Sequence, residues 1–195
     1  MNEVDTERLM ARCEAGLLSD QHIASKRLVS LLDDVWRQLP ELDRHVLRET
    51  IADVTDDPGR VADPARVLGT AGPAYMGEDL VDGLACTAPE DAQIVFNIDS
   101  LDRLSDEAAS AVVAHELAHI LLRHPCLTHA LARKVELGFA EASEALDKAK
   151  ALHEWEADLQ VWIWGFTAEL RCLWKELGDD LPPWYHQIEL EEGPA

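Results

Sequence analysis

The sequence has few positive charges and no long apolar run. Lysine and arginine together number 17, against 38 aspartates and glutamates, and the formal net charge is -21. Nucleic-acid backbones and anionic membrane surfaces are bound by clustered basic residues, so we expect neither as a partner. No stretch approaches the roughly 18 apolar residues of a membrane span, and the acidic residues 1–12 do not resemble a signal peptide. These absences predict a soluble, cytoplasmic protein.

Cysteine is also scarce. The four cysteines are far apart in the chain and form no C-x-x-C pair, so we expect small buried apolar residues rather than zinc ligands or disulfides. Hydrophobic residues make up 47% of the 195-residue chain, which is enough for the core of one compact domain.

The most informative segment is His115-Glu116-Leu117-Ala118-His119, which has the form H-E-x-x-H within an apolar run from 111 to 122. Residues four apart share one face of a helix, so His115 and His119 can present two imidazoles to one metal ion. Glu116 lies beside them, where a carboxylate can act as general base toward a zinc-activated water. The segment therefore predicts a zinc hydrolase.

Two histidines do not complete a hydrolytic zinc site, which needs a third protein ligand and one open position. A histidine six residues after His119 is absent because that position is Pro125, and Leu122 replaces the glycine that such a site requires. His124 and His129 are nearer candidates. However, His124 is expected around the helix from the metal face, where it would cap the helix end.

A later acidic segment offers a better third ligand. Glu154 and Asp158 are four residues apart and share a helix face. Glu154 can bind zinc while Asp158 accepts a hydrogen bond from the distal nitrogen of a ligand histidine. Glu156 is the competing ligand, and His153 is a weaker competitor.

The organisation of the chain is expected to be mostly helical, with an α+β fold. Apolar periodicity predicts helices within 2–53, broken at Pro40, and over 151–177. Ser105 is expected to cap a helix that runs to near Pro125, and the alanines and alternating charges of 128–150 indicate a further helix. Residues 84–87 and 94–98 are predicted to form a β-hairpin, giving a small antiparallel sheet. The expected regions are an N-terminal helical extension (1–55), a Gly/Pro-rich linker (56–80), a catalytic core (81–178) and a C-terminal tail (179–195).

The pattern His115-Glu116-x-x-His119 followed by Glu154-x-x-x-Asp158 resembles the gluzincin signature. The segment from 154 to 158 and the run from 114 to 125 are similar to those of the CAAX-processing and heat-shock-induced membrane zinc endopeptidases. The 35-residue gap from His119 to Glu154 is nearer to minimal soluble gluzincins and to ImmA/IrrE-type regulatory peptidases, although the latter usually have Asn at position 158.

The resemblance implies a zincin-like fold in which the sheet packs on the H-E-x-x-H helix. It also implies a zinc metalloendopeptidase with one Zn²⁺ per chain, His115, His119 and Glu154 as ligands, and Glu116 as general base. The strand before the motif helix would line the substrate cleft.

Further site residues are expected on loops and on that strand. The candidate oxyanion donors are Tyr185, His186 and Tyr75, and the candidate substrate strand contains Ile94, Val95, Phe96 and Asn97. A peptide or protein is the expected substrate, and the N-terminal helices could recruit a regulatory partner. The alternatives are a non-catalytic zinc-binding regulatory module, a narrow-specificity regulatory protease, and a helical interaction protein whose motif arose by chance.

Overall fold

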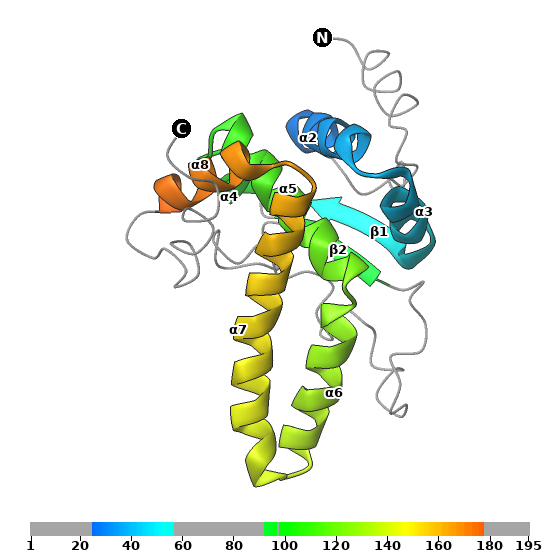
Figure 1. The fold of residues 1–195 in the computed structure, drawn as a ribbon, viewed down its shortest axis with the longest axis vertical. Coiled ribbons are helices and arrows are strands. Elements are labelled where there is room, and N and C mark those ends of the chain that lie inside the picture. Colours follow the sequence, from blue (N-terminus) through cyan, green and yellow to red (C-terminus); the bar gives the residue numbers. More distant parts are fainter. Residues whose placement is uncertain (1–24, 57–91, 97, 178–195) are drawn as a thin grey trace.

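The computed structural model describes residues 25–56, 92–96 and 98–177, and helices predominate in these ranges (Figure 1). The helices are α2 (Lys26–Gln38), α3 (Glu41–Thr50), α4 (Ile98–Leu101), α5 (Asp106–Leu121), α6 (His124–Glu136), α7 (Ala140–Ile163) and α8 (Thr167–Leu177). The strands are β1 (Ile51–Asp56) and β2 (Ala92–Phe96). The mainly helical character agrees with the sequence prediction.

Helix α5 is the centre of the fold. Every residue from 111 to 120 is buried, and α2, α3, α7 and α8 all pack against this helix. A helix buried on all sides has apolar residues around most of its circumference, and the alanines, valines and leucines of α5 meet that requirement. The polar residues of the motif are therefore buried in the central helix of the core.

The N-terminal helices share one hydrophobic core with α5. Leu28, Leu32 and Trp36 on α2 are each 1% exposed or less and belong to the same buried cluster as α5. Arg27 fixes this packing from the surface, because its Nη2 donates to the Leu104 carbonyl at 2.7 Å. The apolar face of α2 is thus used inside the molecule, and a regulatory partner of this helix would have to bind its polar face.

The predicted small antiparallel sheet is wrong. β2 does occupy much of the predicted 94–98 strand, but it pairs in parallel with β1, with Val54 opposite Ile94. β1 lies where the end of a helix and a linker were expected, because its sequence of mixed polar and apolar residues gives little strand signal. Residues 84–91, the other strand and turn of the expected hairpin, lie outside the described residues.

The helix expected over 151–177 is in fact two helices. α7 ends at Ile163 and α8 begins at Thr167, with Gly165 between them at φ +91°. The Gly165 N–H donates to the Trp162 carbonyl and the Phe166 N–H to the Val161 carbonyl, which is a Schellman helix end. A positive φ suits glycine, so this residue allows the chain to turn and α8 to pack back on α5.

Helices α6 and α7 form a long antiparallel hairpin that projects from the rest of the molecule (Figure 1). Gly138 supplies the positive φ, +82°, at the turn between them. Pro125 stands in the first turn of α6, where its missing N–H costs nothing. α7 also extends over the boundary near 150 at which the sequence predicted two separate helices.

Candidate metal centre

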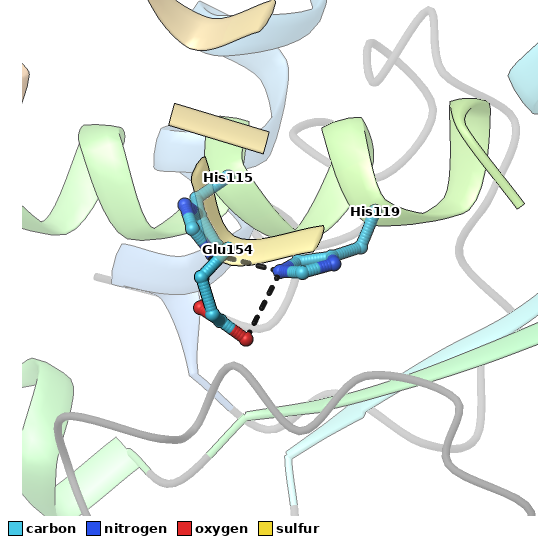
Figure 2. A group of neighbouring side chains, drawn as sticks. All are labelled: His115, His119 and Glu154. Carbon is cyan, nitrogen blue, oxygen red and sulfur yellow. Dashed lines mark hydrogen bonds and ion pairs between the residues drawn. The ribbon is translucent and has the colours of Figure 1, made fainter. Parts of the chain in front are cut away.

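Helix α5 brings the two motif histidines together at its C-terminal end. Ser105 caps the helix as predicted, accepting a hydrogen bond from the Ala108 N–H at 3.2 Å. His115 and His119 lie one helical turn apart, are 4% and 5% exposed, and have their Nε2 atoms 2.8 Å apart. Two imidazoles from a buried helix therefore converge on one point (Figure 2).

Helix α7 adds two carboxylates, one at this point and one behind His115. Oε2 of Glu154 lies 3.2 Å from Nε2 of His115, and its Oε1 lies 3.7 Å from Nε2 of His119 (Figure 2). One turn further along α7, Oδ1 of the buried Asp158 lies 2.8 Å from Nδ1 of His115. Asp158 can thus accept the Nδ1–H of His115, which leaves the Nε2 lone pair directed toward His119 and Glu154.

The three donors fit a zinc ion. Four-coordinate zinc with bonds of about 2.0–2.1 Å separates its ligand atoms by about 3.3 Å. The two Nε2 atoms are 2.8 Å apart, Oε2 of Glu154 lies 3.2 Å from Nε2 of His115, and Oε1 of Glu154 lies 3.7 Å from Nε2 of His119, so each contact is close to that spacing. Two imidazoles and a carboxylate are also a donor set that suits zinc. In the described part of the chain, His115, His119 and Glu154 thus form a group able to hold a metal ion.

The charges of this group depend on one another. Burial opposes the charged form of His115, but hydrogen bonds to Asp158 and Glu154 outweigh burial and raise its pKa well above the ordinary value. Burial would likewise raise the pKa of Glu154, yet hydrogen bonds with both histidines lower it strongly. The carboxylate of Glu154 is therefore kept ionised, as a metal ligand must be.

Glu116 is fully buried next to this group. Burial raises its pKa well above the ordinary value, and the nearby Glu154 carboxylate acts in the same direction, while His115 acts against it. A carboxyl whose proton affinity is raised is able to accept a proton near neutral pH, which a general base requires.

His124 does not have the surroundings that its sequence position suggested. It begins α6 rather than capping α5, because Arg123 adopts a φ of +60° and turns the chain. The ring is 3% exposed, and its Nδ1 lies 2.9 Å from Nδ1 of His119. Burial first, and then the neighbouring His119, lower the pKa of His124 to about 3, so the ring is neutral instead of the partly positive cap expected.

The other predicted site residues fall into two groups. Tyr75, Asn97, Tyr185 and His186 lie outside the described residues. Ile94 and Phe96 of β2 are both completely buried in the core, and Val95 lies between them.

The fold and the donor geometry define a mainly helical protein with a candidate mononuclear metal centre of the H-E-x-x-H type. Comparison with protein families gives a more specific class. The family model described as peptidase family M48 matches residues 84–167, a range that contains α5, α6 and α7 with all the residues of the centre. This match supports a zinc metallopeptidase.

Comparison with curated proteins found no match, and comparison with solved structures found none. In the described part of the chain, no helix combines the length and apolar character needed to cross a membrane.

Proposed function

We propose that this protein is a gluzincin-type zinc metalloendopeptidase in which His115, His119 and Glu154 hold the metal. The observation that carries the proposal is the convergence of three zinc-compatible donor atoms beside the buried Glu116. The match of residues 84–167 to peptidase family M48 supports the broader class, a zinc metallopeptidase, independently of the geometry.

When bound, zinc would supply a Lewis acid that lowers the pKa of a water molecule and polarises the peptide carbonyl. Glu116 would take the proton of the attacking water and pass it to the nitrogen of the leaving amine. Its complete burial on the central helix α5 favours this role, because a buried carboxyl binds a proton more tightly than an exposed one.

The arrangement also leaves one side of the centre accessible. The side chain of Glu154 is 47% exposed, whereas those of His115 and His119 are 5% and 6% exposed. Solvent and substrate would therefore approach past Glu154, while α5 closes the opposite side.

We propose an extended peptide as substrate, with strand 94–97 as a candidate docking strand because peptides can add to a sheet by main-chain pairing. Tyr75, Tyr185 and His186 remain the proposed oxyanion donors. A regulatory partner that binds the N-terminal helices also remains a proposal.

The test compares Glu116→Gln with Glu107→Gln. Both substitutions remove one carboxylate from α5, but Glu107 is exposed in the first turn. Cleavage of a peptide library by the zinc-loaded proteins should fall at least roughly 100-fold for Glu116→Gln, with zinc retained, and should not change for Glu107→Gln. Equal activity in both variants would contradict the general-base role.

The library also separates the alternatives. Zinc binding by the wild type without any cleavage would favour a non-catalytic zinc module. Cleavage at a single site would favour a narrow regulatory protease, and cleavage at many sites a broad peptidase.

A further inference from the structure

A second buried histidine group lies directly behind the proposed metal centre. His124 at the start of α6 contacts His119 through their Nδ1 atoms at 2.9 Å, and its Nε2 lies 3.2 Å from Oε2 of Glu156 on α7. His153 stacks on His124, with ring centroids 4.2 Å apart and planes within 7°. Nothing in the proposed mechanism uses these residues.

Metal binding by His119 would determine which ring nitrogens of His119 and His124 carry a proton. A neutral imidazole carries one N–H, and a ligand nitrogen must be bare. If Nε2 of His119 binds the metal, its proton is on Nδ1 and is donated to Nδ1 of His124. His124 then carries its own proton on Nε2 and donates it to the Glu156 carboxylate.

This arrangement gives each of the three residues a hydrogen-bond partner without any imidazolium. It also gives the two ligand histidines equivalent support. His115 donates directly to Asp158, whereas His119 is connected to Glu156 through His124. Carboxylates that orient ligand histidines in this way raise their basicity and fix their tautomer.

We infer that His124 and Glu156 are positioning residues that form a hydrogen-bond relay holding His119 in its metal-binding tautomer. The inference rests on the proposed function, since it needs a metal at His115, His119 and Glu154. Thr128 supports the relay from behind, because its hydroxyl contacts Nδ1 of His153 at 3.1 Å and so fixes the ring that stacks on His124.

The same atoms could instead form a second metal site, since donors of His124, His153 and Glu156 lie within 4.8 Å of one another. A metal on Nε2 of His124 would move that ring's proton to Nδ1. His124 would then donate this proton to Nδ1 of His119, so a neutral His119 would carry its own proton on Nε2. A protonated Nε2 could not bind the first metal. With neutral imidazoles the two sites exclude each other, so the relay predicts one metal ion per chain.

The first experiment measures zinc affinity by chelator competition in the full-length protein. His124→Leu removes both hydrogen bonds and should weaken zinc binding roughly 10–100-fold. His124→Gln should restore most of the affinity, because its amide can accept from His119 with oxygen and donate to Glu156 with nitrogen. His45→Leu, at a histidine on α3 whose side chain is 64% exposed, is the control and should not change the affinity.

A second measurement reads the relay directly, even if His124→Leu fails to fold. Long-range ¹⁵N–¹H spectra of zinc-loaded wild type should show His119 protonated at Nδ1 and His124 at Nε2. The opposite tautomer of His124, two zinc ions per chain, or equal zinc affinity in wild type and folded His124→Leu would overturn the relay while leaving the proposed function intact. Failure of the wild type to bind zinc would overturn both.

Discussion

The two halves of α7 differ sharply in their surroundings. In the C-terminal half, from 153 to 163, His153, Ala157, Asp158 and Val161 are buried, and Ala157 and Val161 belong to the same core cluster as α5. In the N-terminal half, from 140 to 152, Ala142 is the buried residue among those whose exposure the structure describes, 141–152, and this half lies in the projecting hairpin with α6 (Figure 1). One continuous helix therefore has a surface half and a core half.

Two glutamates of α7, one in each half, show how these surroundings change the interactions of a carboxylate. Glu144 and Glu154 are both glutamates of α7, but Glu144 forms an exposed ion pair with Lys148, whereas Glu154 faces two buried imidazoles. Exposed pairs contribute little because water screens them. The pKa of Glu154 is strongly lowered by hydrogen bonds with His115 and His119.

The largest expected effect is on metal binding, and it contrasts these two glutamates. Glu154→Ala removes one of three protein ligands, so zinc content measured by elemental mass spectrometry should fall from about one ion per chain to a small fraction of that. Glu144→Ala on the surface half should keep the wild-type content. Full zinc retention in Glu154→Ala would show that another residue supplies the third ligand. It would then contradict the assigned difference between Glu154 and Glu144.

The next effect concerns the support of His115. Asp158→Asn keeps the shape of the side chain but weakens the acceptor that faces Nδ1 of His115 at 2.8 Å. Zinc affinity from chelator competition should decrease roughly 10–100-fold. Asp147→Asn, an exposed aspartate of the surface half, is the matched control. A similar loss in both variants would indicate a general effect of charge rather than support of a ligand.

A larger side chain should affect the stability of the protein differently in the two halves of α7. Ala157 is completely buried, so Ala157→Leu overpacks the core and should lower the free energy of unfolding by about 1–3 kcal/mol. Ala151→Leu introduces the same side chain at an exposed position and should change stability by less than about 0.5 kcal/mol. Urea unfolding in the presence of a chelator measures both without any contribution from bound metal. A neutral Ala157→Leu would contradict the assignment of this half to the core.

The smallest effect concerns a carboxylate at the edge of the core. Glu176 on α8 accepts hydrogen bonds from Ser105, whose N–H lies 3.0 Å from its Oε2, and these bonds lower its pKa. A lowered pKa stabilises the fold above the unfolded-state value of about 4.3 and loses this contribution as the pH falls through the folded-state value. Because Glu176 is largely exposed, we expect only a few tenths of a kcal/mol.

Urea unfolding of wild type and Glu176→Gln at several pH values measures this contribution. The wild type should be slightly more stable at pH 7, and the difference should vanish as the pH falls below about 4. A difference that grows at low pH would contradict the sign of the pKa shift.

The sequence predicted local features better than distant pairings. Ser105 and the apolar run after it identify α5 and its start, because a helix cap and a continuous apolar run are local features. The parallel pairing of β1 with β2 joins segments more than 30 residues apart, and no local signal encodes it. Local signals pair β2 with the nearest strand-like run, 84–87, and the antiparallel sheet predicted in this way is wrong.

In the candidate site, too, contacts set by local helix spacing were predicted, and a contact that depends on a change of chain direction was not. The i, i+4 spacing predicted that His115 and His119 share a face, and also that Glu154 and Asp158 do. The contact between His124 and His119 was missed because it depends on the positive φ of Arg123, which redirects the chain between α5 and α6. The sequence signal for this arrangement was His124 followed directly by Pro125. Proline is favoured in the first turn of a helix, so the pair indicates that a new helix begins at this point.

X-ray absorption at the zinc edge of the purified, zinc-loaded protein measures whether zinc is held by two imidazoles and one carboxylate. Binding by His115, His119 and Glu154 predicts a first shell of nitrogen and oxygen only, at about 2.0–2.1 Å, with the outer-shell scattering of two imidazoles. A sulfur ligand at about 2.3 Å, or the scattering of three or four imidazoles, would contradict it.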